Sequence, residues 1–357
     1  MPSSPAVTEE DNTTVRSRPW GTLPLARRPG LPAAMEWAIL LICVLAFIAG
    51  LRLLIRYIPF TSDWEVFFRP TTQGWLEGSL ILYRDTRWFW NPPWLLWLLA
   101  PLAYWPVWLG WGILMVVTMF TIVRLTRKYR AWWLVFVSPL IVDPILAGQI
   151  DVVAMLGVAL GWAAEDRPWL MGIALTLMAT KPQVCFLVAL WLWLHHRQRM
   201  QALKIPALVF LASLVIHGWD WPLRWANGSS TALLVSMIHN ASPWHSIGSW
   251  MVPVVLLLGI WALRLPPTPR NLGALVAANA LITPYLASYS LVMVLAFSFL
   301  PLGPVWAAAG WAASLTPLLR SWFGQGATRV DFIVAAVLMI GYLLNADRHV
   351  YSSQPPE

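Results

Sequence analysis

Apolar runs separated by short polar turns recur along most of the chain. The runs lie near residues 35–55, 106–123, 131–146, 150–164, 168–180, 183–196, 205–219, 247–264, 271–284, 287–300, 304–319 and 330–345. A helix that crosses a bilayer needs roughly 20 apolar residues, and several of these runs are somewhat shorter. The pattern predicts an all-α polytopic membrane protein with about 12 transmembrane helices.

The block from Trp94 to Arg124 is interrupted by Pro101 and Pro106, so it could cross the membrane once or twice. Two crossings would place the basic cluster at 124–130 outside, against the positive-inside rule. We therefore predict a short helix near 94–105 that lies along the outer surface, followed by one crossing.

Composition excludes a soluble globular protein. Of the 357 residues, 59% are hydrophobic and 11% are charged, whereas soluble domains carry about 25% charged residues. The 26 Trp residues fit a chain with many helix ends at the membrane–water interface. The two cysteines, Cys43 and Cys185, lie inside apolar runs and indicate neither a disulfide nor a metal site.

Most Lys and Arg residues fall in clusters on one side of the predicted spans, which indicates the cytoplasmic side. The formal charge of +8 is thus explained by topology, and a nucleic-acid partner is not predicted. We expect residues 1–33 to form a disordered cytoplasmic tail, 34–346 the membrane domain and 347–357 a short cytoplasmic tail. The protein is then a multi-pass cell-membrane protein with both termini inside.

The segment from Arg56 to Pro93 is the longest charged stretch between apolar runs, and the topology places it outside. Ser62 followed by Glu65 is a capping-box pattern, which predicts a juxtamembrane helix in this external loop. Asp63 beside that helix start has two interpretations. It could complement the positive helix end, or it could accept a proton from a sugar hydroxyl as a general base.

Further polar sites fall on the same external side. Lys181 precedes Pro182, so a helix break could leave an ammonium and free N–H groups for a lipid phosphate; otherwise Lys181 is a lysine that snorkels at a helix end. Gln149 and Asp151 flank another external turn, where they could bind substrate or link helices by hydrogen bonds. The sequence has no nucleotide-binding glycine motif and no metal-ligand spacing.

These sites occur in a familiar order. An Asp in the first external loop precedes Gly78 and Tyr83, one residue further apart than in Gly-x-x-x-Tyr, and Asn91-Pro-Pro follows. Gly148-Gln149-Ile-Asp151, Lys181-Pro-Gln183 and a late Thr283-Pro-Tyr285 complete the set, with no histidine beside the last motif. The chain resembles the family-87 glycosyltransferases, also described as a domain of unknown function, which are α-mannosyltransferases that use polyprenol-phosphate-mannose.

The resemblance implies a membrane-embedded GT-C fold, an external active site, a polyprenyl-phosphate sugar donor and a glycolipid or glycan acceptor among membrane lipids. It makes Asp63 the general base. A phosphate leaving group needs compensating charge, for which Lys181, Arg69 and Arg87 are the candidates, with Arg84 as another. No metal or other cofactor is predicted. The candidate substrate-binding residues are Glu65, Tyr83, Asn91, Gln149, Asp151, Gln183 and Tyr285.

Two other functional classes remain as alternatives. A lipid or sugar transporter, including a flippase, would carry charged residues near the middle of its spans and paired halves with interrupted helices. A scaffold without activity would leave the charged external loop unexplained. The predicted function is therefore hexosyl transfer, with a transporter as the alternative.

Overall fold

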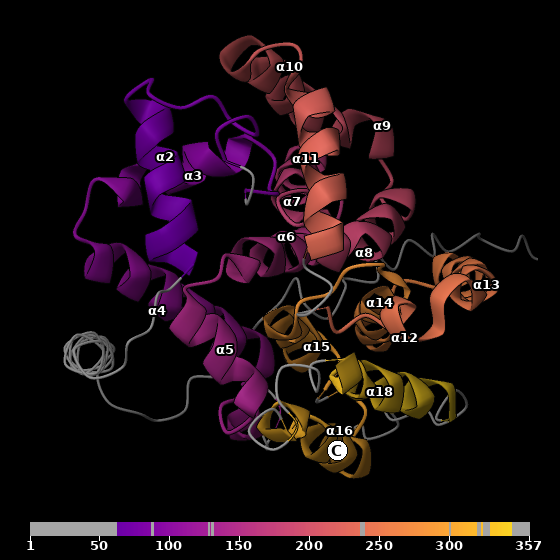
Figure 1. The fold of residues 1–357 in the computed structure, drawn as a ribbon. Helices are drawn as coiled ribbons and strands as arrows, with labels where there is room; N and C mark the ends of the chain where they lie inside the picture. Colours follow the sequence, from indigo (N-terminus) through magenta and orange to yellow (C-terminus); the bar gives the residue numbers. More distant parts are fainter. Residues whose placement is uncertain are drawn as a thin grey trace, which may run out of the picture.

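The computed structural model describes residues 63–86, 89–127, 129, 132–235, 240–299, 301–319, 323 and 329–344. Within these residues the secondary structure is helical, apart from one isolated antiparallel bridge between Asn240 and Ala287. The predicted all-α class is confirmed (Figure 1). The predicted first span at 35–55, both tails and Arg87 lie outside the described residues.

The first described helices form a unit around Trp64. The π-helix η1 (Trp64–Phe68) continues into α2 (Arg69–Leu76), which packs on α3 (Trp94–Ala103). The fully buried Trp64 donates from its indole nitrogen to the Val107 carbonyl at 3.1 Å. A Cβ atom at Gly110 would lie 2.6 Å from the Trp64 ring, so a glycine is required for this contact.

The predicted break at Pro106 is present. Pro106 caps α4 (Val107–Thr126), which has 20 residues and is apolar enough to cross a membrane. The segment from Arg199 to His217, which contains α9 (Arg199–Ala202) and α10 (Lys204–His217), also passes this test. Within the described ranges, seven further apolar helices have 10–17 residues. The number of membrane spans therefore stays a prediction.

The middle of the chain contains four helices that position the polar sites. They are α5 (Pro139–Ala147), α6 (Asp151–Ala163), α7 (Pro168–Met178) and α8 (Pro182–Leu194). The predicted run at 131–146 is divided, because the 3-10 helix η2 (Trp132–Val135) precedes Ser138, which caps α5. A Cβ atom at Gly157 of α6 would lie 2.8 Å from the Met178 backbone nitrogen, so α6 and α7 approach closely there.

The structure contains one long helix that the hydropathy pattern did not predict. The runs predicted at 205–219 and 247–264 leave the residues between them without a predicted helix, and α11 (Trp221–Val235) lies there. Its polar Asn227-Gly-Ser-Ser stretch hides the apolar periodicity. Arg224 holds the helix in place, because its guanidinium donates to the carbonyls of Leu82 at 2.7 Å and His217 at 2.6 Å.

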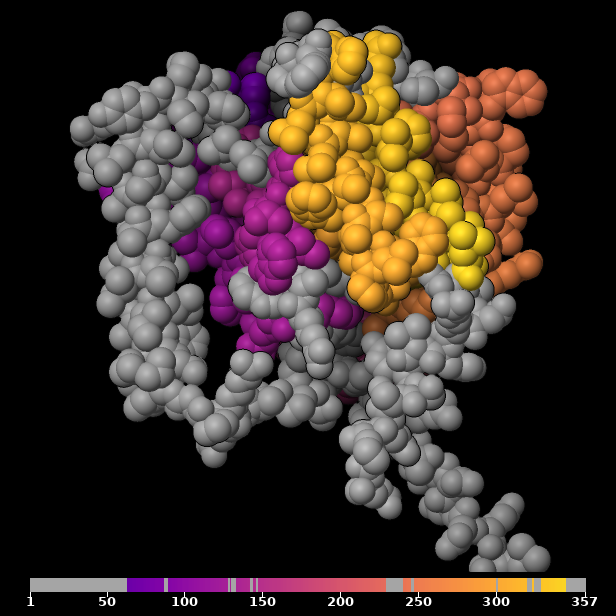
Figure 2. All heavy atoms as spheres, turned by 90° about the horizontal axis from the view of Figure 1, so that it is seen from below, coloured from indigo at the N-terminus to yellow at the C-terminus, as the bar shows by residue number. Residues whose placement is uncertain are grey.

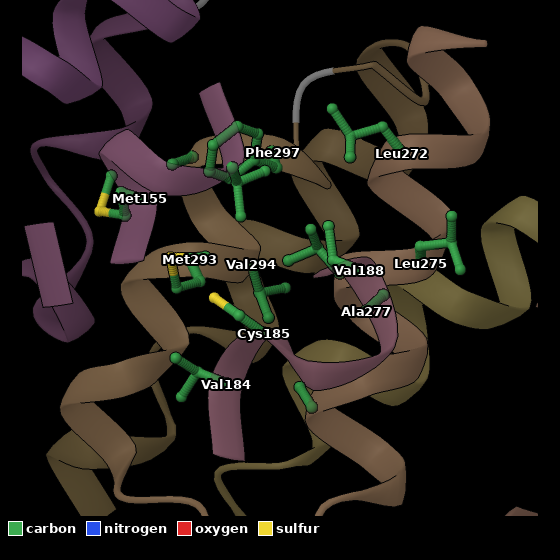
Figure 3. Packing of buried hydrophobic residues seen from close by; sticks show 14 of the residues in the cluster. Met155, Val184, Cys185, Val188, Leu272, Leu275, Ala277, Met293, Val294 and Phe297 are labelled. Atoms are coloured by element: carbon green, nitrogen blue, oxygen red, sulfur yellow. The ribbon is translucent and has the colours of Figure 1, made fainter. Parts of the chain in front are cut away.

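The C-terminal third packs beside α5, as the orange and yellow segments beside the magenta ones show in Figure 2. Its helices are α12 (Trp244–Ile247), η4 (Gly248–Trp250), α13 (Met251–Arg264), α14 (Pro269–Ile282), η5 (Ser288–Leu291), α15 (Val292–Phe297), α16 (Pro304–Ala313), η6 (Thr316–Leu319) and α18 (Ile333–Leu344). Helices α8, α14 and α15 share the main apolar core (Figure 3). Asn279 is fully buried in α14, where it accepts from the Leu187 backbone N–H at 2.9 Å and so links α14 to α8.

Candidate functional site

Asp63 stands directly before the π-helix η1 and has helical backbone angles, with φ −58° and ψ −29°. Its side chain caps no backbone N–H of that helix. Instead the carboxylate oxygen Oδ2 accepts a hydrogen bond from the side-chain amide of Gln149, 86 residues away. The neighbouring Trp64 is fully buried, so it anchors the partly exposed Asp63 in place.

Gln149 reaches Asp63 because of the turn between α5 and α6. Gly148 ends α5 in the left-handed conformation, with φ +62°. A Cβ atom at this position would lie 2.7 Å from the Trp111 ring and 2.9 Å from the Trp64 Cβ. Both the backbone angle and the close approach require glycine, which explains the Gly148-Gln149 pair in physical terms.

Lys181 lies at the start of α8, where Pro182 is the first helical residue and the predicted helix break is present. The Lys181 side chain is only 6% exposed. Its ammonium donates to Asp151 Oδ2 at 2.6 Å and to Gln149 Oε1 at 3.4 Å. It also lies 4.6 Å from the centre of the Tyr289 ring, a cation–π distance.

Asp63, Gln149, Lys181 and Asp151 therefore form one continuous chain of contacts between η1, α8 and the two ends of the α5–α6 turn. Gln149 links the two ends of this chain of contacts. Its side-chain oxygen accepts from Lys181, and its side-chain nitrogen donates to Asp63. Asp151 is 1% exposed, and its second oxygen, Oδ1, is buried without a hydrogen-bond partner. Asp151 is thus the ion-pair partner of Lys181, and Asp63 is the second carboxylate of this group.

Tyr83 and Asn91 connect the first loop to the turn that carries Lys181. Tyr83 has a positive φ of 65° and donates from its hydroxyl to the Asn91 carbonyl at 2.5 Å. The Asn91 amide in turn donates to the Thr180 carbonyl at 2.8 Å, directly before Lys181. Both side chains are buried, and burial raises the pKa of the Tyr83 hydroxyl well above its usual range. This arrangement holds the Lys181 turn against the first loop.

Tyr285 lies in the loop after α14, near the same group. Its ring meets Trp90 edge to face, with ring centres 5.6 Å apart. Burial raises the pKa of the Tyr285 hydroxyl to about 12; a hydrogen bond with Tyr289 opposes this rise, and the carboxylates of Asp63 and Asp151 add to it. The Tyr285 hydroxyl is therefore neutral at physiological pH and serves as a hydrogen-bonding group.

The late loop is held by Asn240. Its side-chain oxygen accepts from the backbone N–H groups of Ser242 and Leu286, and its amide donates to the Pro284 carbonyl at 3.0 Å. These bonds fix the Thr283-Pro284-Tyr285 motif beside the chain from 240 to 242.

The other predicted site residues have different environments. Glu65 is exposed, and Arg69 is half-buried with its Nε atom lacking a hydrogen-bond partner. Gln183 is half-buried, and its backbone carbonyl accepts from Asn279 at 3.1 Å. Arg84 pairs with Asp85 at 3.0 Å in an exposed loop.

Three residues near the site were not predicted. Tyr289 falls inside an apolar run, so nothing in the pattern distinguishes it from a core aromatic. Trp90 is one of many tryptophans, although its place directly before Asn91-Pro-Pro is a signal that could have been used. Arg224 lies between two predicted runs, where no motif drew attention to it.

No group of three or more His, Cys, Asp or Glu side chains within the described ranges is arranged to hold a metal ion. The polar groups that converge at the site are two carboxylates, one ammonium and one amide, with tyrosine hydroxyls beside them. These groups can bind hydroxyls by hydrogen bonds and can accept a proton.

The comparisons with known proteins give one match. The model of the family described as Glycosyltransferase family 87 matches residues 89–288, which is more than half of the chain. No curated protein and no solved structure matches. The matched range includes Asn91, Gln149, Asp151, Lys181 and Tyr285, whereas Asp63 precedes it.

Proposed function

The chain belongs to glycosyltransferase family 87, and on this premise we propose that it transfers a hexose from a polyprenyl phosphate to an acceptor hydroxyl on the external face. Mannose is the first sugar to test. The single observation that carries the proposal is the Asp63 carboxylate, which Gln149 holds beside the buried Lys181–Asp151 pair.

The proposed reaction breaks one bond and forms another at the anomeric carbon of the sugar. The acceptor hydroxyl oxygen bonds to that carbon, and the bond from the carbon to the phosphate oxygen breaks. Asp63 takes the proton from the hydroxyl, while polyprenyl phosphate leaves with the bonding electrons. A carboxylate held within hydrogen-bond reach of an attacking hydroxyl is suited to this role.

Charge on the leaving phosphate needs a cation. Lys181 is the proposed donor-phosphate residue, although its ammonium contacts Asp151 at 2.6 Å in the structure. It would stabilise the phosphate through its field, or directly if donor binding draws the ammonium from Asp151. Arg69 is the second candidate, because its half-buried guanidinium has an Nε atom with unused hydrogen-bonding capacity. Arg87 is proposed from the sequence alone.

The donor class follows from the side of the membrane. The chain lacks a nucleotide-binding glycine motif, and nucleotide sugars are not available outside the cytoplasm. A transferase whose site faces outward therefore needs a sugar carried by a lipid. Trp90 and Tyr285, which meet edge to face, are the aromatic residues proposed to contact the apolar face of a hexose.

Donor binding tests this proposal. Purified protein in detergent is mixed with polyprenyl-phosphate mannose, with polyprenyl phosphate or with a nucleotide-linked mannose, and native mass spectrometry measures the bound mass. We expect a one-to-one complex with the polyprenyl-phosphate sugar and none with the nucleotide sugar. Asp63→Asn is the matched variant, which we expect to bind the donor like the wild type. A complex with the nucleotide sugar alone would contradict the proposal.

A further inference from the structure

A cavity lies away from the candidate site, between the ends of four helices. It has a volume of about 170 Å³ and is lined by Arg124 and Leu125 of α4, by α6 residues, and by Leu272 of α14 and Phe297 of α15. The α6 residues are Ala159, Trp162 and Ala163. Among the described residues that line it, Arg124 is the charged one and the others are apolar.

This cavity is separate from the site of Asp63 and Lys181. Asp151 begins α6 at that site, whereas residues in the last turns of the same helix line the cavity. Eleven residues of α-helix from Asp151 to Trp162 span roughly 17 Å at 1.5 Å per residue. Figure 3 shows Phe297 and Leu272 at one end of the core and Val184, near Lys181, at the other. The cavity therefore opens at the opposite end of the helices.

Several turns meet at the end where the cavity lies. The Trp191 indole donates to the Leu265 carbonyl at 2.8 Å, and the Gln198 amide donates to the Asp166 carbonyl at 3.5 Å. These contacts bring together the turns after α6, α8 and α13. Basic residues outnumber acidic ones there: Arg124, Arg127, Arg167, Arg197, Arg199, Lys204, Arg264 and Arg270 against Glu165 and Asp166.

Within the part of the chain that the structure describes, no carboxylate forms an ion pair with Arg124. The ion pairs among the described residues are Arg84–Asp85, Lys181–Asp151 and Arg224–Asp220, and none of them involves Arg124. Its guanidinium is half-buried at the rim of an apolar hollow. A planar guanidinium in such a place matches the oxygens of a phosphate, which it can bind with two parallel hydrogen bonds.

We infer that this cavity is a binding site for an anionic phospholipid of the cytoplasmic leaflet, with the phosphate on Arg124 and the start of one acyl chain among Trp162, Leu272 and Phe297. A dry apolar cavity of about 150 Å³ accepts a benzene-sized group, so the measured volume suits a short stretch of chain. Basic pockets between helices on the cytoplasmic side attract anionic lipids. The lipid is a bound partner at this site, distinct from the proposed sugar donor.

Lipid retention tests the inference. Purified wild-type protein is exchanged into detergent that contains dioleoyl phosphatidylglycerol or dioleoyl phosphatidylcholine, and native mass spectrometry measures how much lipid stays bound. We expect preferential retention of phosphatidylglycerol. Arg124→Gln should weaken that retention about tenfold, as for loss of a charge-assisted hydrogen bond. Arg127→Gln is the matched control, since Arg127 is exposed and does not line the cavity.

Filling the cavity tests the acyl-chain half. Ala159→Phe and, at the rim, Ala163→Phe should each reduce retention of both lipids. Phosphatidylglycerol with bromine on its acyl chain should quench the fluorescence of Trp162. The total tryptophan fluorescence should therefore be quenched less in Trp162→Phe than in the wild type. Equal losses of phosphatidylglycerol retention in Arg124→Gln and Arg127→Gln would mean that the lipid is attracted to the basic surface in general. That result would overturn the proposed site. Unchanged lipid retention in both Ala159→Phe and Ala163→Phe would also overturn the proposed site.

Discussion

Lys181→Met is expected to destabilise the protein by about 3–5 kcal/mol, because it leaves the Asp151 carboxylate buried without its cation. The Lys181 and Asp151 side chains are 6% and 2% exposed and 2.6 Å apart. Methionine retains much of the aliphatic stem, so lost packing contributes little. Thermal unfolding of the purified protein in one detergent measures the change.

Two controls separate charge from packing in that experiment. The double variant Lys181→Met with Asp151→Leu removes both charges, and we expect it to recover most of the lost stability. Arg84→Met breaks the exposed pair with Asp85 and should leave the unfolding midpoint unchanged. If the double variant unfolds as early as the single one, the buried pair is not the cause. A stable double variant that binds no donor would support a donor-binding role for the Lys181–Asp151 pair.

Asp63→Asn is expected to lower turnover by roughly 10²–10⁴-fold, because the amide cannot accept the acceptor proton at neutral pH. The substitution is nearly isosteric. Its side-chain oxygen can still accept the hydrogen bond that Gln149 donates to Asp63, so the fold and the site geometry should persist. Turnover at saturating donor, beside a thermal-unfolding check, measures the effect.

Glu65→Gln is the matched control for Asp63→Asn. Glu65 lies two residues after Asp63, in η1, and is exposed, so removal of its charge should leave turnover near the wild-type value. Near-normal turnover in Asp63→Asn together with a large loss in Glu65→Gln would make Glu65 the base. If neither variant loses turnover, the acids of the loop are structural and the proposed transfer step loses its base.

The helices were predictable because apolar runs with proline at their starts mark them directly. The run at 168–180 corresponds to α7 (Pro168–Met178), and the one at 183–196 to α8 (Pro182–Leu194). Helix α11 was missed because packing stabilises it: Trp221 is 3% exposed, and Arg224 bonds carbonyls far away in the sequence. Such tertiary contacts leave no trace in local hydropathy.

The candidate site was predictable only as a set of motifs on one side. The structure places the side chains of Asp63, Gln149 and Lys181 in contact, while their catalytic and binding roles remain predictions. The Lys181–Asp151 pair joins residues 30 apart, and no periodicity connects them. Tyr289 was missed because an aromatic residue in an apolar run cannot be distinguished by sequence from a core residue. Its contact with the Lys181 ammonium is visible only in the structure.

The most direct measurement is sugar transfer by the purified wild-type protein reconstituted in lipid vesicles. The donors are a polyprenyl-phosphate hexose and a nucleotide-linked hexose, both radiolabelled in the sugar, and membrane lipid extract supplies the acceptor. Chromatography with mass spectrometry follows the labelled product. We predict a new glycosidic product and free polyprenyl phosphate from the lipid-linked donor only, and almost none with Asp63→Asn. Transfer from the nucleotide sugar, or movement of the intact lipid across the vesicle without any glycosidic product, would contradict a lipid-dependent glycosyltransferase and would favour a transporter in the second case.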